Sequence, residues 1–522
     1  MPSRPRPDRG AATNTPAPPA RSGGFLDAVE RLSRRVPNAL NLFLWLCLAI
    51  VIASFVASLM GASAIHPATG ETVRATNLLQ AEHVRRLLVE MPRTFTAFPP
   101  LGSVLVVMIG IGLAERSGLI GASLGRLMRM APPALLPLTV VFTGIMASIA
   151  VDAGFLIVPP LGAAVFWAAG RHPLAGLCAA YAGVSGGFSA NLLITGLDPL
   201  LAGLTEVAAQ LLVPEYQVLA TANWFLMTAL VPLLSVAGAL VTSRIIEPRL
   251  GAYVPEPGLG RLATSDATPI ERRALARTGW AALFLLGILL ALTLPEGAVL
   301  RDPETGSIQP FFQAIVGIIT LSLGALGLVY GAAVGSIRNT DDAIGMCEAT
   351  LADMAVYILL VFVAAQFLAL FAWSNLGTLI AIGGGNLLKA SGLGTVPLLL
   401  ALILLCGLIN LFITSASAKW ALLAPVFVPM FMAVGISPEL TQAAYRVGDS
   451  FSNIIAPTMV YIPLLLAFAG RYVPGFPLGR LLTLMLPYSL AFLLCGAGLL
   501  ALFLMLELPV GPGAPSTVAF PG

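Results

Sequence analysis

Residues Phe412 to Tyr461 read FITSASAKWALLAPVFVPMFMAVGISPELTQAAYRVGDSFSNIIAPTMVY, and this stretch decides the fold. Long apolar runs flank it on both sides, which places it at the depth of a membrane. It nevertheless carries three charged residues, Lys419, Arg446 and Asp449, and each charge is costly inside a bilayer. Six glycines and prolines also break it. Broken backbone is tolerated there only where it is buried in protein or lines a wet cavity, so the stretch predicts a transport site.

An earlier stretch, Met146–Leu200, repeats the pattern. Five residue pairs share an offset of 265: Asp152 with Ser417, Pro160 with Pro425, Phe166 with Phe431, Gly170 with Gly435, and Pro173 with Pro438. After the alignment shifts by one to three residues, the tetrapeptide Phe188–Asn191 (FSAN) aligns with the tripeptide Phe451–Asn453 (FSN). Apolar segments that are interrupted at matching positions in two halves of a membrane protein indicate a transporter binding site.

The composition is that of a polytopic membrane protein. Of 522 residues, 57% are hydrophobic and only 10% are charged, and the mean hydropathy is +0.91. The five cysteines lie in or beside apolar spans, which predicts small buried side chains and no disulfide framework. The sequence has no HExxH, Walker or GxSxG motif, so we expect neither an enzyme nor an ATP-driven pump, and no nucleic-acid partner.

Hydropathy predicts an all-α membrane fold with about nine transmembrane helices and two re-entrant helical hairpins. The hairpins are Leu135–Ala169 and Val396–Val434, and the two broken helices are Pro173–Gly203 and Pro438–Gly470. The expected organisation is a disordered cytoplasmic tail at 1–24, a membrane domain at 25–506 with repeat units at about 133–205 and 396–470, and a C-terminal tail at 507–522. Residues Phe25–Val36 form either an amphipathic surface helix or the first turns before a span.

The positive-inside rule orients this arrangement. With the N-terminus in the cytoplasm, twenty of the 28 basic residues fall on the inside. Six fall outside, namely Arg74, Arg85, Arg86, Arg93, Arg301 and Lys389. The two hairpins then enter from opposite sides, so the repeats are inverted, and the C-terminus lies on the outer side. Inverted repeats are the arrangement that alternating access needs.

Three stretches resemble the AbgT family of p-aminobenzoyl-glutamate transporters: Ser185–Gly203 (SGGFSANLLITGLDPLLAG), Ile413–Met432 (ITSASAKWALLAPVFVPMFM) and Tyr445–Pro457 (YRVGDSFSNIIAP). The resemblance extends from about Phe25 to Leu506 and is greatest to the branch credited with exporting p-aminobenzoate and sulfonamides. It implies a homodimer of nine-span, two-hairpin subunits in the bacterial inner membrane, with elevator-type motion. The functional residues that it implies are Asp198, Ser417, Trp420, Pro438, Arg446, Asp449 and Pro457.

Arg446 and Asp449 have two readings. The planar guanidinium of Arg446 matches a substrate carboxylate bidentately, which is the role we favour because an ionisable residue inside a membrane is functional by default. The alternative is a structural ion pair with Asp449, three residues on and on the same helix face. In a combined scheme, Asp449 releases Arg446 when it is protonated or meets a cation, which couples ion to substrate.

Other candidates also have two readings. Trp420 at the second hairpin tip either stacks on an aromatic ring or belongs to an interfacial belt. Lys419 is either a second contact for the anion or a side chain that snorkels to the interface. Asp152 at the first tip is either a cation or proton site or a helix cap. The Asp-Pro step at Asp198 often only starts a helix, so its role rests on the resemblance.

Hydroxyl and amide side chains cluster beside the predicted breaks. With freed carbonyls they suit Na⁺, and the alternative is helix capping and helix–helix hydrogen bonding. Their symmetric placement favours possible Na⁺ sites at the two hairpin tips. The candidates are Ser148, Asn191, Thr414, Ser415, Ser417 and Asn453.

We therefore expect a secondary active transporter of a small aromatic carboxylate, driven by H⁺ or Na⁺ and without another cofactor. The substrate is either p-aminobenzoyl-glutamate, taken up, or p-aminobenzoate and sulfonamides, exported. The alternatives are an ion channel with re-entrant loops, an uptake carrier for another dicarboxylate and, more weakly, a membrane-embedded enzyme.

Overall fold

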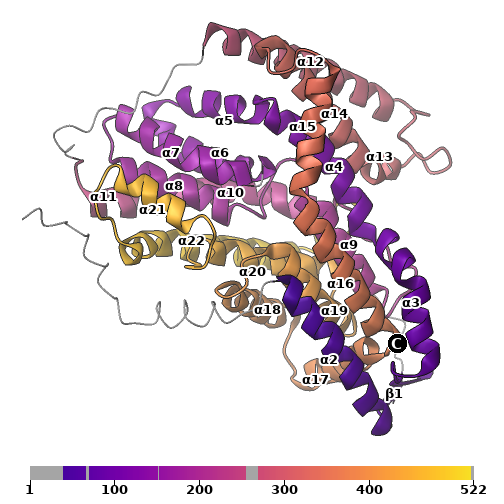
Figure 1. The fold of residues 1–522 in the computed structure, drawn as a ribbon. Coiled ribbons are helices and arrows are strands. Elements are labelled where there is room, and N and C mark those ends of the chain that lie inside the picture. Colours follow the sequence, from indigo (N-terminus) through magenta and orange to yellow (C-terminus); the bar gives the residue numbers. More distant parts are fainter. Residues whose placement is uncertain (1–38, 66–69, 151, 254–267, 519–522) are drawn as a thin grey trace, which may run out of the picture.

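The computed structural model describes residues 39–65, 70–150, 152–253 and 268–518, and most of these residues are helical (Figure 1). The expected tail at 1–24 and the segment Phe25–Val36 lie outside the described residues. A single short hairpin among them pairs β1 (Ser63–Ile65) antiparallel with β2 (Thr72–Arg74). The predicted all-α fold is confirmed.

Seven helices of the described chain are long and apolar enough to cross a membrane, or up to eight if one bent pair counts as a single span. The sequence predicts nine crossings. The difference corresponds to the two broken spans, in which no single helix is long enough to cross.

One group of helices forms a layer that runs down the right side and across the top of Figure 1. It contains α2 (Ala39–Leu59), α3 (Ala81–Thr96), α4 (Pro99–Arg116), α12 (Pro269–Thr293), α13 (Gln309–Gln313), α14 (Ile315–Val334), α15 (Thr340–Asp353) and α16 (Ala355–Trp373). Within it, α14 packs against α4 and α12, α15 packs against α4, and α16 packs against α2 and α3. We call this group the scaffold.

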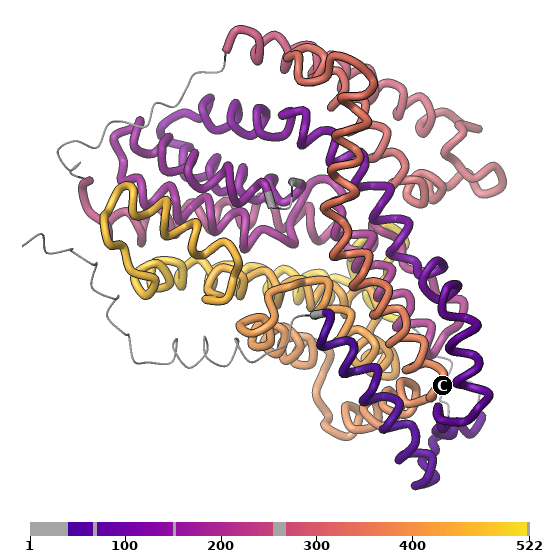
Figure 2. The backbone as a smooth tube through the Cα atoms, in the orientation of Figure 1, coloured from indigo at the N-terminus to yellow at the C-terminus, as the bar shows by residue number. Residues whose placement is uncertain are grey.

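Two structural repeats contain the remaining helices of the described chain. The first comprises α5 (Leu119–Arg129), η1 (Pro133–Leu135), α6 (Leu136–Met146), η2 (Ala147–Ala150), α7 (Asp152–Ala168), α8 (Pro173–Gly186), α9 (Leu197–Ala209), α10 (Trp224–Val241), η3 (Thr242–Ile246) and α11 (Glu247–Leu250). The second comprises α17 (Leu376–Ala390), α18 (Thr395–Asn410), α19 (Ala416–Met432), α20 (Pro438–Asn453), α21 (Ile462–Gly470) and α22 (Leu478–Met505). On the left of Figure 2, helices of the first repeat lie above α21 and α22 of the second.

The packing of the repeats is reciprocal. In the first repeat α8 lies against both hairpin arms, α6 and α7, and in the second α20 lies against α18 and α19. Beyond each break the chain packs on the hairpin of the other repeat, so that α9 contacts α19 and α21 contacts α7. The two hairpins and the two broken spans predicted from the sequence are thus present and interlocked.

The turn between each hairpin and its broken span is the same in both repeats. Gly170 and Gly435 both have positive φ, at 73° and 86°, where glycine carries no steric penalty. Pro173 and Pro438 then begin α8 and α20, a position at which proline loses no helical hydrogen bond. The residue pairs at the offset of 265 therefore mark structurally equivalent positions.

An aromatic pair also recurs. The rings of Trp420 and Tyr445 are stacked with centroids 4.4 Å apart. In the first repeat, Phe155 lies at the offset of 265 from Trp420, and its ring centroid is 6.1 Å from that of Tyr181, one residue past the position that matches Tyr445. Each pair joins the second arm of a hairpin to the first half of its broken span, so it fixes the hairpin against that helix.

Among the described helices of ten or more residues, three lie in segments for which the sequence predicts no helix. They are α5, α15 and α17, of 11, 14 and 15 residues. Each is shorter than a bilayer crossing, and α15 has two aspartates in its first turn, so a search for long apolar runs misses them.

Residues 507–518 pack against the rest of the chain. Val510 is fully buried, and its carbonyl accepts a hydrogen bond of 3.1 Å from the amide of Leu226 at the start of α10. Further along, the amide of Val518 donates to the carbonyl of Gly435, and the carbonyl of Ser516 accepts from the amide of Ser437. The segment thus connects the start of α10 to the linker before α20.

Exposed apolar side chains cover the outer helices of the scaffold. Trp280 and Phe284 on α12 are 74% and 70% exposed, and Leu321 on α14 is 75% exposed. On a soluble protein such surfaces would aggregate, whereas in a bilayer they contact lipid tails.

The fold predicts that the segments before and after α14 lie on opposite sides of the membrane. In a variant without the five native cysteines, we expect Glu304→Cys and Asp341→Cys to react with an impermeant maleimide from opposite sides. Both side chains are exposed, so accessibility does not limit the reaction. Labelling of both from the same side would contradict the crossing by α14.

Candidate functional site

The two broken spans cross where their helices end. The first is unwound between Gly186, the last residue of α8, and Leu197, the first of α9, as predicted near Ser185–Gly187. In this break the Ser189 hydroxyl donates to the carbonyl of Arg446 (3.1 Å), and its amide donates to the Ser450 hydroxyl (3.2 Å). Helix α20 therefore satisfies polar groups that unwinding exposes in the other repeat.

Arg446 lies at this crossing and pairs with Asp198. Its Nη1 lies 2.6 Å from Asp198 Oδ1, and the two residues are 3% and 1% exposed. The other carboxylate oxygen of Asp198 accepts from the amide and the hydroxyl of Thr195, at 2.6 and 2.9 Å. Among the residues that the structure describes, the buried Nε and Nη2 atoms of Arg446 have no hydrogen-bond partner, so two donor atoms of the guanidinium are open to another acceptor.

The alternative interpretation, a structural ion pair between Arg446 and Asp449, is contradicted by the structure. Asp449 pairs with Lys419, which is fully buried and also donates to Asn410 Oδ1. Spacing of three residues brings two side chains near each other on a helix, but here each finds a partner on a different element. Since Lys419 is completely enclosed, the snorkelling alternative is wrong.

Trp420 is also enclosed and stacks on Tyr445, so its assignment to an interfacial belt is wrong. Its indole Nε1 donates to the Thr205 hydroxyl at 2.9 Å, and Thr205 donates to Gln442 Oε1 at 2.6 Å. This chain of hydrogen bonds ties the second hairpin to α9 and α20.

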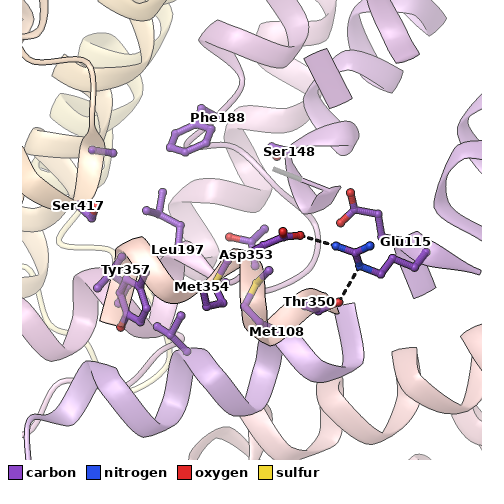
Figure 3. Close-up of a pocket in the computed structure, with 16 residues that line it drawn as sticks. Met108, Glu115, Ser148, Phe188, Leu197, Thr350, Asp353, Met354, Tyr357 and Ser417 are labelled. Carbon is purple, nitrogen blue, oxygen red and sulfur yellow. Dashed lines mark hydrogen bonds and ion pairs between the residues drawn. The ribbon is translucent and has the colours of Figure 1, made fainter. Parts of the chain in front are cut away.

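A cavity of about 640 Å³ opens between the repeats and the scaffold. Ser148 and Ser417 from the two hairpin tips contribute to its wall, and Figure 3 shows Ser148 near Phe188 and Ser417 on another side. The remaining wall comes from the first broken span and from α4, α15 and α16. Its lining residues are Val104, Met108, Glu115, Arg116, Ser148, Phe188, Thr195, Gly196, Leu197, Leu200, Thr350, Asp353, Met354, Tyr357, Ala416 and Ser417.

The scaffold side of the cavity combines apolar and charged groups. Arg116 pairs with Asp353 and donates to the Thr350 hydroxyl at 3.1 Å (Figure 3). Nearby, Met354 and the ring of Tyr357 supply an apolar surface. Small-molecule sites typically join such apolar walls to a few placed polar groups.

Arg446 and Trp420 do not line the cavity. Arg446 is one layer behind it, because its partner Asp198 is bonded to Thr195, which is a wall residue. Ser417 is the predicted substrate residue that faces the cavity directly. In this conformation the guanidinium is therefore shielded from a molecule in the cavity.

The predicted ion-site residues are arranged differently at the two tips. At the first tip, Asn191 Nδ2 donates to the Ser148 hydroxyl at 2.8 Å. The backbone of Asp152 begins α7, but its side chain lies outside the described part of the structure. At the second tip, Asn453 Nδ2 donates to Asp449 Oδ2 at 3.3 Å, so Asn453 belongs to the Lys419 cluster.

The remaining candidates surround the second tip and the second break. Ser415 caps α19 by accepting a hydrogen bond from an amide, and its hydroxyl lies 3.3 Å from that of Ser417. Thr414 is half-buried in the tip. Pro438 is the first residue of α20, and Pro457 is half-buried in the break between α20 and α21.

Sequence reasoning missed Asn410, Thr205 and Gln442. Asn410 donates to Ser452 and Asn453 and accepts from Lys419. Asn410 could have been recognised in the sequence, because it is a single amide at the end of the apolar run that precedes the second tip. Thr205 and Gln442 carry no comparable signal because hydroxyl and amide groups are common in membrane helices.

The comparisons with known proteins agree with this architecture. The family model described as "AbgT putative transporter family" matches residues 24–518. The chain belongs to this family. It is 37% identical over 496 residues to the p-aminobenzoyl-glutamate transport protein of Escherichia coli K12, covering 95% of this chain and 97% of that protein.

Two solved structures are similar throughout. One is the YdaH transporter of Alcanivorax borkumensis, described as having an unusual topology, with a TM-score of 0.87, 45% identity and coverage of 91% of this chain and 100% of that one. The other is MtrF of Neisseria gonorrhoeae, described as illuminating a class of antimetabolite efflux pumps, with a TM-score of 0.89, 41% identity and coverage of 94% and 100%. This AbgT-family chain is thus a multi-pass membrane transporter and not an enzyme.

The pair between Arg446 and Asp198 predicts a specific loss of stability. Asp198→Ala leaves an uncompensated guanidinium buried, which should cost about 3–5 kcal/mol. Replacing both partners at once, Arg446→Met with Asp198→Leu, should cost less because no charge remains. Thermal unfolding of purified protein in detergent measures the relative stabilities of the single variant, the double variant and the wild type.

The exposed Glu304→Ala serves as the control and should unfold like wild type. If the single Asp198 variant is as stable as wild type, the pair does not hold the two repeats together.

Proposed function

We propose that this AbgT-family transporter is a secondary active carrier of small aromatic carboxylates, either p-aminobenzoyl-glutamate or p-aminobenzoate and sulfonamides. The observation that carries the proposal is Arg446, a buried guanidinium at the crossing of two broken helices, of which two donor atoms have no partner within the described part of the chain. An arginine offers a carboxylate two parallel hydrogen bonds, and a poorly hydrated site makes them strong.

The cavity fits this substrate class. Its volume of about 640 Å³ lies within the usual range for small-molecule sites. Tyr357 and Phe188 provide aromatic surfaces, and Ser417 and Ser148 provide hydroxyls. The name of the E. coli relative gives p-aminobenzoyl-glutamate as its cargo, and MtrF is described as one of a class of antimetabolite efflux pumps.

Binding at Arg446 requires a local movement. The second hairpin tip, with Ala416 and Ser417, and the first break, with Thr195, separate the arginine from the cavity. We infer that a carboxylate first enters the cavity and then reaches Arg446 as these segments shift. The two repeats with their hairpins then move as a body against the scaffold, in the elevator manner of inverted-hairpin carriers.

The coupling ion is H⁺ or Na⁺. Ser148 and Asn191 are oxygen-bearing side chains at an unwound segment, a setting that suits Na⁺. Asp449 and Asp152 are the acidic alternatives for a proton. Since either ion drives secondary transport, imposed gradients must separate them.

We also infer a homodimer in the bacterial inner membrane, with the N-terminus cytoplasmic and the C-terminus on the outer side. The family resemblance supports the dimer, and the count of basic residues supports the orientation. The reported relatives are transporters and an efflux pump, which favours a carrier over an ion channel. An uptake carrier for another dicarboxylate remains the second candidate, since Arg446 would serve any carboxylate.

Arg446→Lys tests the substrate site. The variant keeps the charge but loses the bidentate contact, so affinity should fall by roughly 5- to 150-fold, on the order of 1–3 kcal/mol. Binding of p-aminobenzoate and of its glutamate conjugate to purified protein measures the loss, and liposomes with imposed gradients give the direction of transport.

The matched control is Arg272→Lys, the same change at an exposed position of α12. Wild-type affinity in the Arg446 variant would place the carboxylate elsewhere. Binding of an aliphatic dicarboxylate in preference to both aromatic compounds would favour the second candidate.

The first tip predicts how transport depends on Na⁺. Asn191→Ala removes an amide beside Ser148, so the Na⁺ concentration for half-maximal uptake or efflux should rise about tenfold. Asn386→Ala, on an exposed face of α17, should leave it unchanged. Transport that follows only the pH gradient, in wild type and both variants, would assign the coupling to a proton.

A further inference from the structure

The ammonium group of Lys419 is held as a bound cation would be. Its side chain is fully enclosed, and Nζ contacts Asp449 Oδ1 and Asn410 Oδ1. These two oxygens come from α20 and from the end of α18, and Lys419 itself is on α19. One cation thus joins both arms of the second hairpin to the broken helix.

The surrounding groups reinforce this arrangement. Asn410 Nδ2 donates to Asn453 Oδ1 at 2.7 Å and to the Ser452 hydroxyl at 2.8 Å, which turns its oxygen towards Lys419. Asp449 is 1% exposed, and its second oxygen accepts from Asn453. The ring of Tyr445, centred 5.9 Å from Nζ, faces the ammonium group as well. The cluster is therefore a set of oxygen ligands around the ammonium group of Lys419, which balances the negative charge of Asp449.

The first repeat has no side chain at the position that corresponds to Lys419. The residue that corresponds to Lys419 at the offset of 265 is Gly154, which has no side chain. Asn191, which matches Asn453 in the repeated Phe-Ser-(Ala)-Asn motif, lies in the first break and donates to the Ser148 hydroxyl at the first tip. The second tip thus carries a fixed cation at a position where the first tip has a glycine.

We infer that Lys419 is a tethered cation that replaces a coupling ion at the second hairpin tip. A carboxylate and an amide oxygen at the junction of a hairpin and a broken helix are ligands for Na⁺, and the ammonium group satisfies them permanently. The second tip therefore closes on α20 without binding Na⁺. This inference deepens the proposed function, since it assigns ion coupling to the first tip or to a proton.

Removal of the tether should create a dependence on external cations. Lys419→Ala leaves Asp449 buried and unpaired, so we expect transport to fall by more than about 100-fold. Na⁺ or ethylammonium should then restore it, because either can enter the vacated position, and wild type should not respond to ethylammonium. The control is Lys389→Ala, the other lysine of the chain, which is exposed.

A binding measurement separates this inference from the proposed function. The unfolding temperature of purified Lys419→Ala should rise with the logarithm of Na⁺ or ethylammonium concentration above the dissociation constant, whether or not the correct substrate has been found. The double variant Lys419→Ala with Asp449→Asn has no unpaired charge and should lose this response. If no cation stabilises Lys419→Ala more than wild type, Lys419 is only a structural partner of Asp449 and the inference is overturned.

The wild-type background gives a second test if Lys419→Ala does not fold. If the wild type responds to Na⁺, Asn453→Ala should respond in the same way. If the wild type does not respond to Na⁺, the variant should not respond either. Loss of a wild-type sodium response in Asn453→Ala would place Na⁺ at the second tip and overturn the inference. A failure of aromatic carboxylates to be transported by any variant would instead count against the proposed function, and the unfolding measurements would still decide the role of Lys419.

Discussion

Charges inside a membrane must be neutralised by other charges, and this requirement organises the centre of the molecule. Four buried ionisable side chains form two pairs, Arg446 with Asp198 and Lys419 with Asp449. Helix α20 supplies one member of each pair. Because Arg446 and Asp449 are three positions apart and face different partners, this half-helix connects the second hairpin to the first repeat.

Such pairs are not kept for stability alone. Desolvation of two ions offsets most of their attraction, so a well-packed apolar pair of the same size is often at least as stable. Losing one partner, in contrast, leaves a charge that the interior cannot solvate. The presence of the whole pair therefore changes the stability of the protein little, whereas the loss of one partner destabilises it strongly. This property suits a site that must respond to an incoming anion or cation.

The internal repeat explains why much of this fold could be predicted. The two repeats have equivalent turns, which are marked in the sequence by Gly170 and Gly435 and by Pro173 and Pro438. These turns can be recognised because a positive φ and the first position of a helix strongly restrict the residue type. The partner of Arg446 could not be predicted in the same way. Spacing along one helix identified Asp449, whereas Asp198 reaches Arg446 only after the two broken spans cross, 248 residues apart in sequence. Short or polar helices such as α5 and α15 also lack the long apolar run on which span prediction depends.

The C-terminal segment bears on how freely the two repeats can separate. Residues 510–518 supply hydrogen-bond partners to the amides of Leu226 and Ser437 and to the carbonyl of Gly435. These groups lie at the start of α10 in the first repeat and before α20 in the second. A rearrangement that pulled these two points apart would have to break all three backbone hydrogen bonds, so the segment acts as a non-covalent cross-link that favours movement of the two repeats as one body.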